Sequence, residues 1–237
     1  MKRFYLLFIM IASGFVAVAQ KTILNDANAE LRPLSGSFNA IKVSNGIDLY
    51  ISQYQKEALA VSASEQKYKD GIKAVVENNT LIIYYDGDSK WGSDKKLKVY
   101  ISFKELQNIQ ASGSCDVQVS GTIEVNTLAL EMSGSSDFKG DLNVKKLSIH
   151  LSGSSDASLS GVATDVSIES SGASDINGYN LITETCRAKA SGASDIKLTV
   201  NKELSASASG ASEIFYKGSG IIKDQHASGS SSISKKS

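Results

Sequence analysis

The sequence is poor in the residues that bind metals, form disulfides and interrupt strands. Its 237 residues include two His, two Cys, one Trp and one Pro. Two separated His and Cys leave almost nothing for a zinc site or a Cys–His catalytic pair. The 25 basic side chains balance 25 acidic ones, so the basic excess typical of a nucleic-acid-binding protein is missing. A hydrophobic content of 41% is enough to bury a core in one large domain or two small ones.

Only one long apolar run occurs, and it lies at the N-terminus. It spans residues 4–18, follows Lys2 and Arg3, and ends in Ala17-Val18-Ala19, the small-x-small pattern of a signal peptidase site. A membrane-spanning helix needs about 20 apolar residues, more than this run provides. We therefore predict a signal peptide over residues 1–19, no membrane span after cleavage, and an exported protein that is periplasmic, on the outer surface or secreted. Residues 20–36, polar and containing Pro33, are predicted to be a leader or linker.

Serine is concentrated in the second half, with 10 serines in residues 1–110 and 29 in residues 111–237. The reason is a repeat of the form Ser-Gly-small-small-acid, first seen at Ser112 to Asp116. Its glycines recur every 18 to 21 residues, and they are Gly113, Gly134, Gly153, Gly172, Gly192, Gly210 and Gly229. A constant period of this length is typical of a repeat architecture.

Alignment on these glycines places apolar residues in rows separated by polar ones. The row six residues before each glycine holds Leu128, Leu147, Val166, Cys186 and Leu204. This period-2 pattern predicts short strands, and a coil of about 19 residues with a glycine corner is typical of a parallel β-helix. We predict an all-β, right-handed parallel β-helix, with about six coils over residues 107–233 and these five side chains stacked inside.

The first half is also rich in alternating segments but lacks a period. Residues 72–76 and 81–85 flank Asn78-Asn79, which predicts a hairpin. Ile109 already falls in an inward row of the repeat, so we predict a single domain over residues 37–233, with irregular β-structure over 37–110 and repeats over 111–233. Residues 86–96 are polar and predicted to be a loop, in which Trp91 is either an exposed contact or a packed lid.

Several stretches together resemble a family of exported bacterial proteins called putative auto-transporter adhesins, with a head GIN domain, which is frequent in Bacteroidetes. The resemblance rests on the Ser-Gly-x-x-Asp repeats and on two stretches, Phe38-x-x-Ile41-x-Val43-Ser44-x-Gly46-Ile47-Asp48-Leu49-x-Ile51 and Asn79-Thr80-Leu81-x-Ile83. It covers roughly residues 37–233. It implies a right-handed β-helix and an adhesin function, and it supplies no catalytic residues.

The acid that closes each repeat is the strongest candidate for chemistry. This row consists of Asp116, Asp137, Asp156, Asp175, Asp195 and Glu213. Stacked carboxylates about 5 Å apart repel by roughly 1–3 kcal/mol per pair, so something must offset the repulsion. Each Asp accepts hydrogen bonds from the backbone of its own corner, or calcium binds between coils, or the row binds a ligand. We favour the structural role; no cofactor is predicted, with calcium as the alternative.

The remaining reactive residues do not form a catalytic group. A polysaccharide lyase or glycosidase on a β-helix needs a distinct acidic pair with a basic partner, but the acids form a uniform row and the only Arg of the second half is Arg187. His150 and His226 fall on an outward row. Cys115 and Cys186 lie almost four coils apart, roughly 17 Å, too far for a disulfide. We predict two free thiols and no catalytic, cofactor-binding or metal-binding residue.

These observations favour an exported, non-catalytic binding or scaffold module, an adhesin that contacts a glycan or a protein at the cell envelope. The alternatives are a carbohydrate-active enzyme on a β-helix and a purely structural envelope protein. Most tyrosines lie in the first half, at Tyr50, Tyr54, Tyr68, Tyr84, Tyr85 and Tyr100. Since tyrosine is enriched at contact surfaces, the first half is the better candidate for ligand contacts.

Overall fold

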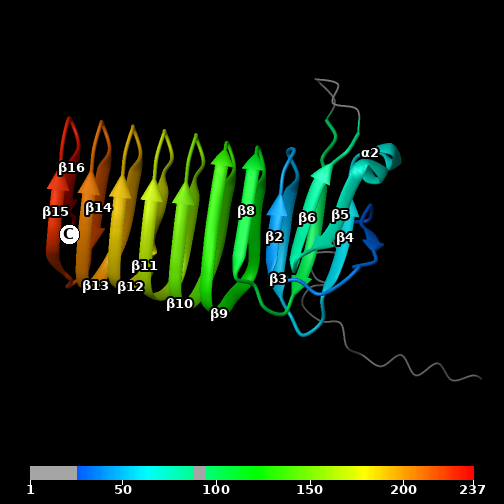
Figure 1. Ribbon diagram of the computed structural model, residues 1–237, viewed down its shortest axis with the longest axis horizontal. Helices are drawn as coiled ribbons and strands as arrows, with labels where there is room; N and C mark the ends of the chain where they lie inside the picture. Colours follow the sequence, from blue (N-terminus) through cyan, green and yellow to red (C-terminus); the bar gives the residue numbers. More distant parts are fainter. Residues whose placement is uncertain (1–25, 88–93) are drawn as a thin grey trace, which may run out of the picture.

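The repeats form a stack of parallel strands (Figure 1), and their apolar rows lie inside it. The computed structural model describes residues 26–87 and 94–237, with 66% of the chain in strands and 3% in helix. The expected signal peptide and Trp91 lie outside the described residues. The repeats build a β-solenoid of about seven turns with coils of about 19 residues, which confirms the predicted all-β solenoid.

Five long bent strands make up most of the solenoid, and each forms nearly a whole coil. They are β9 (Asp116–Gly134), β10 (Asp137–Leu151), β11 (Ala157–Ser170), β12 (Ile176–Ala190) and β13 (Asp195–Ala208). Each pairs in parallel with the next. β14 (Glu213–Lys217) and β15 (Ile221–Ala227) form the coil after β13, and β16 (Ser232–Lys235) begins the next coil by pairing in parallel with β14.

The predicted inner row is confirmed. Leu128, Leu147, Val166, Cys186 and Leu204 pair in register from coil to coil, and each is at most 5% exposed. A coil cannot bury its own apolar side chains, so this stacking supplies the hydrophobic core of the repeat region.

The first half continues the two sides of the solenoid as two branches of strands. One branch joins β9 through β8 (Asn108–Gly113), β2 (Ala40–Val43), β6 (Thr80–Tyr85) and β5 (Ile72–Glu77). The other joins β9 through β3 (Asp48–Gln53), β7 (Lys98–Phe103), β4 (Ala58–Ser62) and β1 (Glu30–Arg32). Ile109 pairs with both Ile41 and Leu130, so the halves share one core, as Ile109 predicted.

The N-terminal end differs from the repeats because its outer strands run antiparallel. β4 pairs antiparallel with β7, and β1 with β4, while β5 and β6 form the predicted hairpin around Asn78 and Asn79, both at positive φ. A short helix, α2 (Gln66–Gly71), lies at this end (Figure 1). Within the predicted leader or linker of residues 20–36, residues 30–32 form strand β1 and belong to the sheet; the expectation of a bare connector is wrong there.

The repeat glycines lie at one corner of the coil with φ between +74° and +95°, as the motif predicted. They also stack directly: a Cβ on Gly153 would lie 2.5 Å from the carbonyl oxygen of Gly134 in the coil below. Close backbone approach therefore adds to the positive φ as a reason for glycine.

Candidate functional site

Strand pairing places one outward-facing row of side chains along the β3–β7 branch and the coils that follow. Tyr50 pairs with Tyr100 on one side and with Gln118 on the other. Residues in register on neighbouring strands point to the same side of a sheet. We call this set the polar row, and it consists of Tyr100, Tyr50, Gln118, Lys139, Ser158, Asn177 and Lys197.

One end of the polar row opens into a hollow of about 360 Å³, which we call the tyrosine cleft. It brings together residues from the N-terminal segment, β3, β4 and β7, and from the stretch that leads into β7. Its lining consists of Asp26, Asn28, Tyr50, Ser62, Ala63, Ser64, Lys96, Lys98 and Tyr100. Its volume lies at the lower end of the range for small-molecule sites, and six of its nine lining residues are polar or charged, beside the two tyrosines and Ala63.

The two tyrosines form the wall of the tyrosine cleft. Their rings stack with centroids 5.2 Å apart and an interplanar angle of 23°. Tyr100 is 6% exposed, and its Oη donates a hydrogen bond of 2.7 Å to Oδ2 of Asp26. Burial and this hydrogen bond raise the pKa of Tyr100. Burial alone would raise the pKa of Asp26, but hydrogen bonds from Tyr100, Ser62 and the backbone of Asn28 outweigh it and lower the pKa. Tyr100 therefore stays a neutral donor, and Asp26 a charged acceptor.

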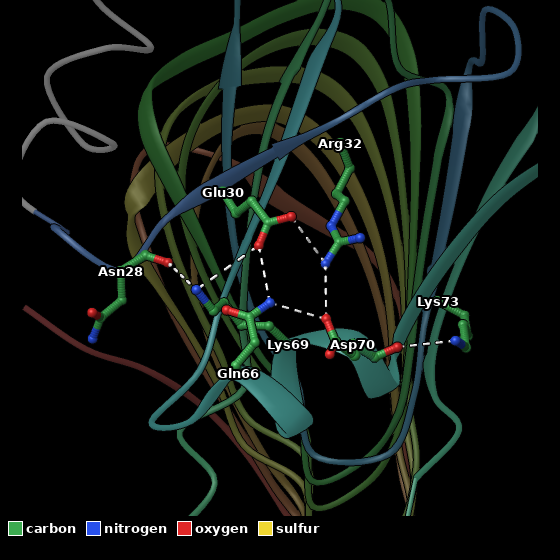
Figure 2. Close-up of polar contacts among 7 residues, drawn as sticks. All are labelled: Asn28, Glu30, Arg32, Gln66, Lys69, Asp70 and Lys73. Atoms are coloured by element: carbon green, nitrogen blue, oxygen red, sulfur yellow. Dashed lines mark hydrogen bonds and ion pairs between the residues drawn. The ribbon is translucent and has the colours of Figure 1, made fainter.

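A charged cluster holds the N-terminal segment that forms the other wall (Figure 2). Arg32 of β1 lies between Glu30 and Asp70, with N–O distances of 3.3 and 3.7 Å. Lys69 of α2 lies 3.9 Å from Glu30 and donates to the backbone oxygen of Asn28 at 3.3 Å. Because Asn28 lines the tyrosine cleft, these contacts fix the cleft wall to the helix. All charged members are paired with one another, which indicates a structural role for the cluster.

Further along, the polar row crosses a second hollow of about 300 Å³, the coil groove. Its polar-row members are Gln118, Lys139, Ser158 and Asn177. Its floor contains Asp141, which accepts hydrogen bonds from Thr122 Oγ1 at 2.7 Å and from Ser160 Oγ at 2.9 Å. These contacts hold the Asp141 carboxylate in one position at the edge of the groove.

The predicted acidic row runs beside the polar row, two residues earlier on each strand. It continues onto β3 through Asp48, whose pKa is raised by burial and then by the charge of Asp116. Asp195 behaves likewise: burial and then the charges of Asp175 and Glu213 raise its pKa. We call this row the carboxylate ladder, and it consists of Asp48, Asp116, Asp137, Asp156, Asp175, Asp195 and Glu213.

The ladder carboxylates do not bind their own corners, and that part of the structural hypothesis is wrong. Three of them accept instead from the backbone of the next coil: Asp137 Oδ1 from the Asp156 N–H at 3.3 Å, Asp156 Oδ1 from the Asp175 N–H at 3.0 Å, and Asp175 Oδ1 from the Asp195 N–H at 3.1 Å. These bonds lie at the exposed surface. Because the coils stack, a backbone N–H of the next coil lies above each of these carboxylates. An isolated turn would offer a carboxylate only the N–H groups of its own backbone.

The serine two residues after each glycine, for which no role was predicted, does satisfy the corner. Ser136, Ser155, Ser174, Ser194 and Ser212 are all 0% exposed. Ser174 Oγ accepts the N–H of Ser155 at 3.2 Å and donates to the carbonyl of Ser171 at 3.1 Å. Cys115 begins this column and donates to the carbonyl of Ser112. The signal was present in the sequence, since a small hydroxyl residue recurs there in register.

The other candidates lie apart from the hollows. His150 is exposed beside Glu169, with an N–O distance of 3.6 Å, and His226 and Arg187 are exposed on outward positions. Cys115 and Cys186 are free and buried, as predicted, and burial raises the pKa of Cys186 to about 12. Within residues 26–87 and 94–237, no group of three or more His, Cys, Asp or Glu is placed to hold a metal ion.

The sequence pattern that pointed to the tyrosine cleft was weaker than the one that marked the serine column. Tyr50 and Tyr100 stood among the first-half tyrosines, but their stacking depends on the pairing of β3 with β7, fifty residues apart. Asp26 and Asn28 lie in the segment expected to be a linker. Of the tyrosines that the sequence offered, these two line the cleft, whereas Tyr54, Tyr68 and Tyr84 do not.

Proteins of known structure share this architecture. In the described part of the chain, no helix is long and apolar enough to cross a membrane. A search of curated proteins gave no match. The crystal structure of a putative adhesin from Bacteroides fragilis is 26% identical, with a TM-score of 0.80, covering 89% of this chain and 98% of that one. A putative adhesin from Parabacteroides merdae (20% identity, TM-score 0.70) and a putative lipid binding protein from Parabacteroides distasonis (24%, 0.68) each cover 90% of this chain and 98% of their own, and share its fold.

A family model described as "Putative auto-transporter adhesin, head GIN domain" matches residues 37–220. The match spans both branches of the first half and nearly all the coils, and it agrees with the resemblance that the Ser-Gly-x-x-Asp repeats carried. The chain belongs to this family of head GIN domain adhesins.

Proposed function

We propose that the protein is an exported, non-catalytic binding module that contacts a glycan or a protein at the cell envelope through the tyrosine cleft. The observation that carries this proposal is the stacked Tyr50–Tyr100 pair, fixed by Asp26 at the wall of a 360 Å³ hollow. Pre-positioned aromatic and polar groups lower the ordering cost of binding. The family description supports an adhesin role, and the N-terminal sequence supports export to the periplasm, the outer surface or the medium.

The test is binding of the purified protein to glycan and protein-ligand arrays, repeated with three variants. Tyr50→Ala removes the outer tyrosine of the stack, and Asn28→Ala removes an exposed amide of the cleft. Tyr84→Ala, on β6 and outside the cleft, is the matched control. We expect at least a tenfold loss of affinity for Tyr50→Ala, a smaller loss for Asn28→Ala and none for the control, with circular dichroism showing all three folded. Binding that survives both cleft variants would contradict the proposal.

The non-catalytic part of the proposal has its own test. The uniform carboxylate ladder offers no distinct acid and base, so we expect no release of reducing ends or unsaturated products from polysaccharides. Turnover that disappears on substituting Asp137, Asp156 or Asp175 would establish the carbohydrate-active enzyme instead. A protein that binds no array component and whose loss weakens the envelope would be the structural alternative.

A further inference from the structure

We propose that the ligand is an extended, neutral, β-linked polysaccharide that lies along the solenoid axis, from the tyrosine cleft across the coil groove. The inference rests on the proposed function and names its ligand class. The tyrosine cleft and the coil groove are joined because Tyr50, which lines the first, is in register with Gln118, which lines the second. Six consecutive members of the polar row, from Tyr100 to Asn177, therefore line one path.

The spacing of this path favours a sugar chain. Neighbouring strands lie about 4.8 Å apart, so the six positions span roughly 24 Å. One pyranose unit of an extended β-linked chain is close in length to one interstrand spacing, so each coil faces one sugar. An extended peptide advances about 3.3 Å per residue and falls out of register with the coils.

The side chains on the path suit sugar hydroxyls. Gln118 and Asn177 each offer a donor and an acceptor, and Ser158 offers a hydroxyl. The Asp141 carboxylate, held by Thr122 and Ser160, is an acceptor at the groove floor. Tyr50 gives the cleft an amphipathic wall with a polar tip.

Charge decides between neutral and acidic polymers. The carboxylate ladder runs beside the path from Tyr50 to Asn177 and repels polyuronates and phosphate-bearing chains; beside Tyr100 the position in register with Asp48 is Lys98. Three lysines lie on the path, Lys96 and Lys98 in the tyrosine cleft and Lys139 in the coil groove. They do not offset the seven acidic side chains on or beside it, which are Asp26, Asp48, Asp116, Asp137, Asp141, Asp156 and Asp175. Hydroxyl groups, in contrast, can donate to the ladder carboxylates.

The test measures how affinity depends on chain length, by titration calorimetry with neutral β-1,4-linked hexose oligomers of two to six units. We expect affinity to rise at least tenfold from dimer to hexamer, and polyuronate hexamers to bind at least tenfold more weakly than neutral ones. The double variant Gln118→Ala/Asn177→Ala should lose the gain with length yet keep the dimer affinity. The control Asn143→Ala/Gln225→Ala removes exposed residues of the same types outside both hollows and should behave as wild type.

The outcomes separate this inference from the proposed function. Equal affinity for dimer and hexamer, or a double variant that matches wild type, overturns the extended path but leaves binding at the tyrosine cleft intact. Preference for a polyuronate or a protein, with Tyr50→Ala still abolishing binding, overturns the neutral polysaccharide. Hexamer binding that is indifferent to Tyr50→Ala overturns both.

Discussion

Two neighbouring columns of small polar residues at the corner of the coil have different physical roles. The serine hydroxyls are buried and complete the hydrogen bonding of backbone groups that water cannot reach. The ladder carboxylates of Asp137, Asp156 and Asp175 are exposed, and the N–H groups that they accept from can also bond to water. Burial, more than charge, therefore decides which column supports the fold.

The first prediction compares the two columns. Ser174→Ala leaves the buried N–H of Ser155 unpaired and should lower the free energy of unfolding by about 1–3 kcal/mol. Asp156→Ala removes only an exposed acceptor and should cost less than about 1 kcal/mol. Urea unfolding of both variants measures the difference, and a larger cost for Asp156→Ala would return the structural role to the carboxylates.

The second prediction concerns the pH dependence of stability. Burial and the charges of Asp175 and Glu213 raise the folded-state pKa of Asp195 above 3.8, its ordinary value. The charged form is thus disfavoured in the folded state, and the penalty is present above the raised pKa and absent below 3.8. Asp195→Asn should increase stability at pH 7, by at most about 1 kcal/mol because the group is only partly buried and water screens its charge.

At pH 3 the stabilisation from Asp195→Asn should vanish, because wild-type Asp195 is then protonated in both states. Thermal melts at pH 7 and pH 3 test this, with Asp224→Asn on β15, outside the ladder, as the control. A gain that persists at pH 3, or that the control reproduces, would show that ladder repulsion is not its cause.

At the scale of the element, the coil depends on its glycine corner. Gly153 has φ +80° and no room for a Cβ, because the carbonyl of Gly134 lies directly below it. Gly121 has a similar φ of +82° but nothing within 4 Å of its Cβ position. The pair separates the cost of conformation from the cost of close stacking.

The third prediction uses this pair. Gly121→Ala should lower the free energy of unfolding by about 1–2 kcal/mol, the cost of a left-handed conformation for a residue with a Cβ. Gly153→Ala should lower the free energy of unfolding by clearly more, or prevent folding, because the added Cβ also forces neighbouring coils apart. Equal costs in chemical denaturation would mean that the stack adjusts without strain.

The sequence predicted the elements that repeat and, from the turn signal Asn78-Asn79, the β5–β6 hairpin, but not the elements that lack both a period and a local turn signal. The row of Leu128, Leu147 and Val166 could be predicted because the repeat period places each residue above the equivalent residue of the preceding coil. The antiparallel pairing of β1 and β4 and the helix α2 have no period, and they depend on contacts between segments far apart in the chain. The tyrosine cleft falls in this second class, since Asp26 and Tyr100 meet only after β7 has paired with β3.

At the scale of the whole molecule, the coils stack along one axis and the N-terminal branches lie at one end of the stack (Figure 1). The pairing of the coils aligns the outward rows along this axis, and the cleft lies among the N-terminal branches, between β3, β4 and β7. The regular coils supply a long face with one side chain per coil, and the irregular end supplies a hollow with aromatic walls. The tyrosine cleft, the proposed ligand site, therefore forms where the repeat gives way to the antiparallel strands. This division of labour is the central claim of the account.

Hydroxyl-radical footprinting of the protein with a neutral β-1,4-linked hexose hexamer tests that claim most directly. Mass spectrometry then reports the oxidation of each tyrosine with and without the hexamer. We expect Tyr50 to be protected by the hexamer, and Tyr54 and Tyr84, which lie outside the cleft, to be oxidised at unchanged rates. Protection of Tyr84 on the opposite branch with Tyr50 unchanged, or no protection at saturating hexamer, would contradict the account.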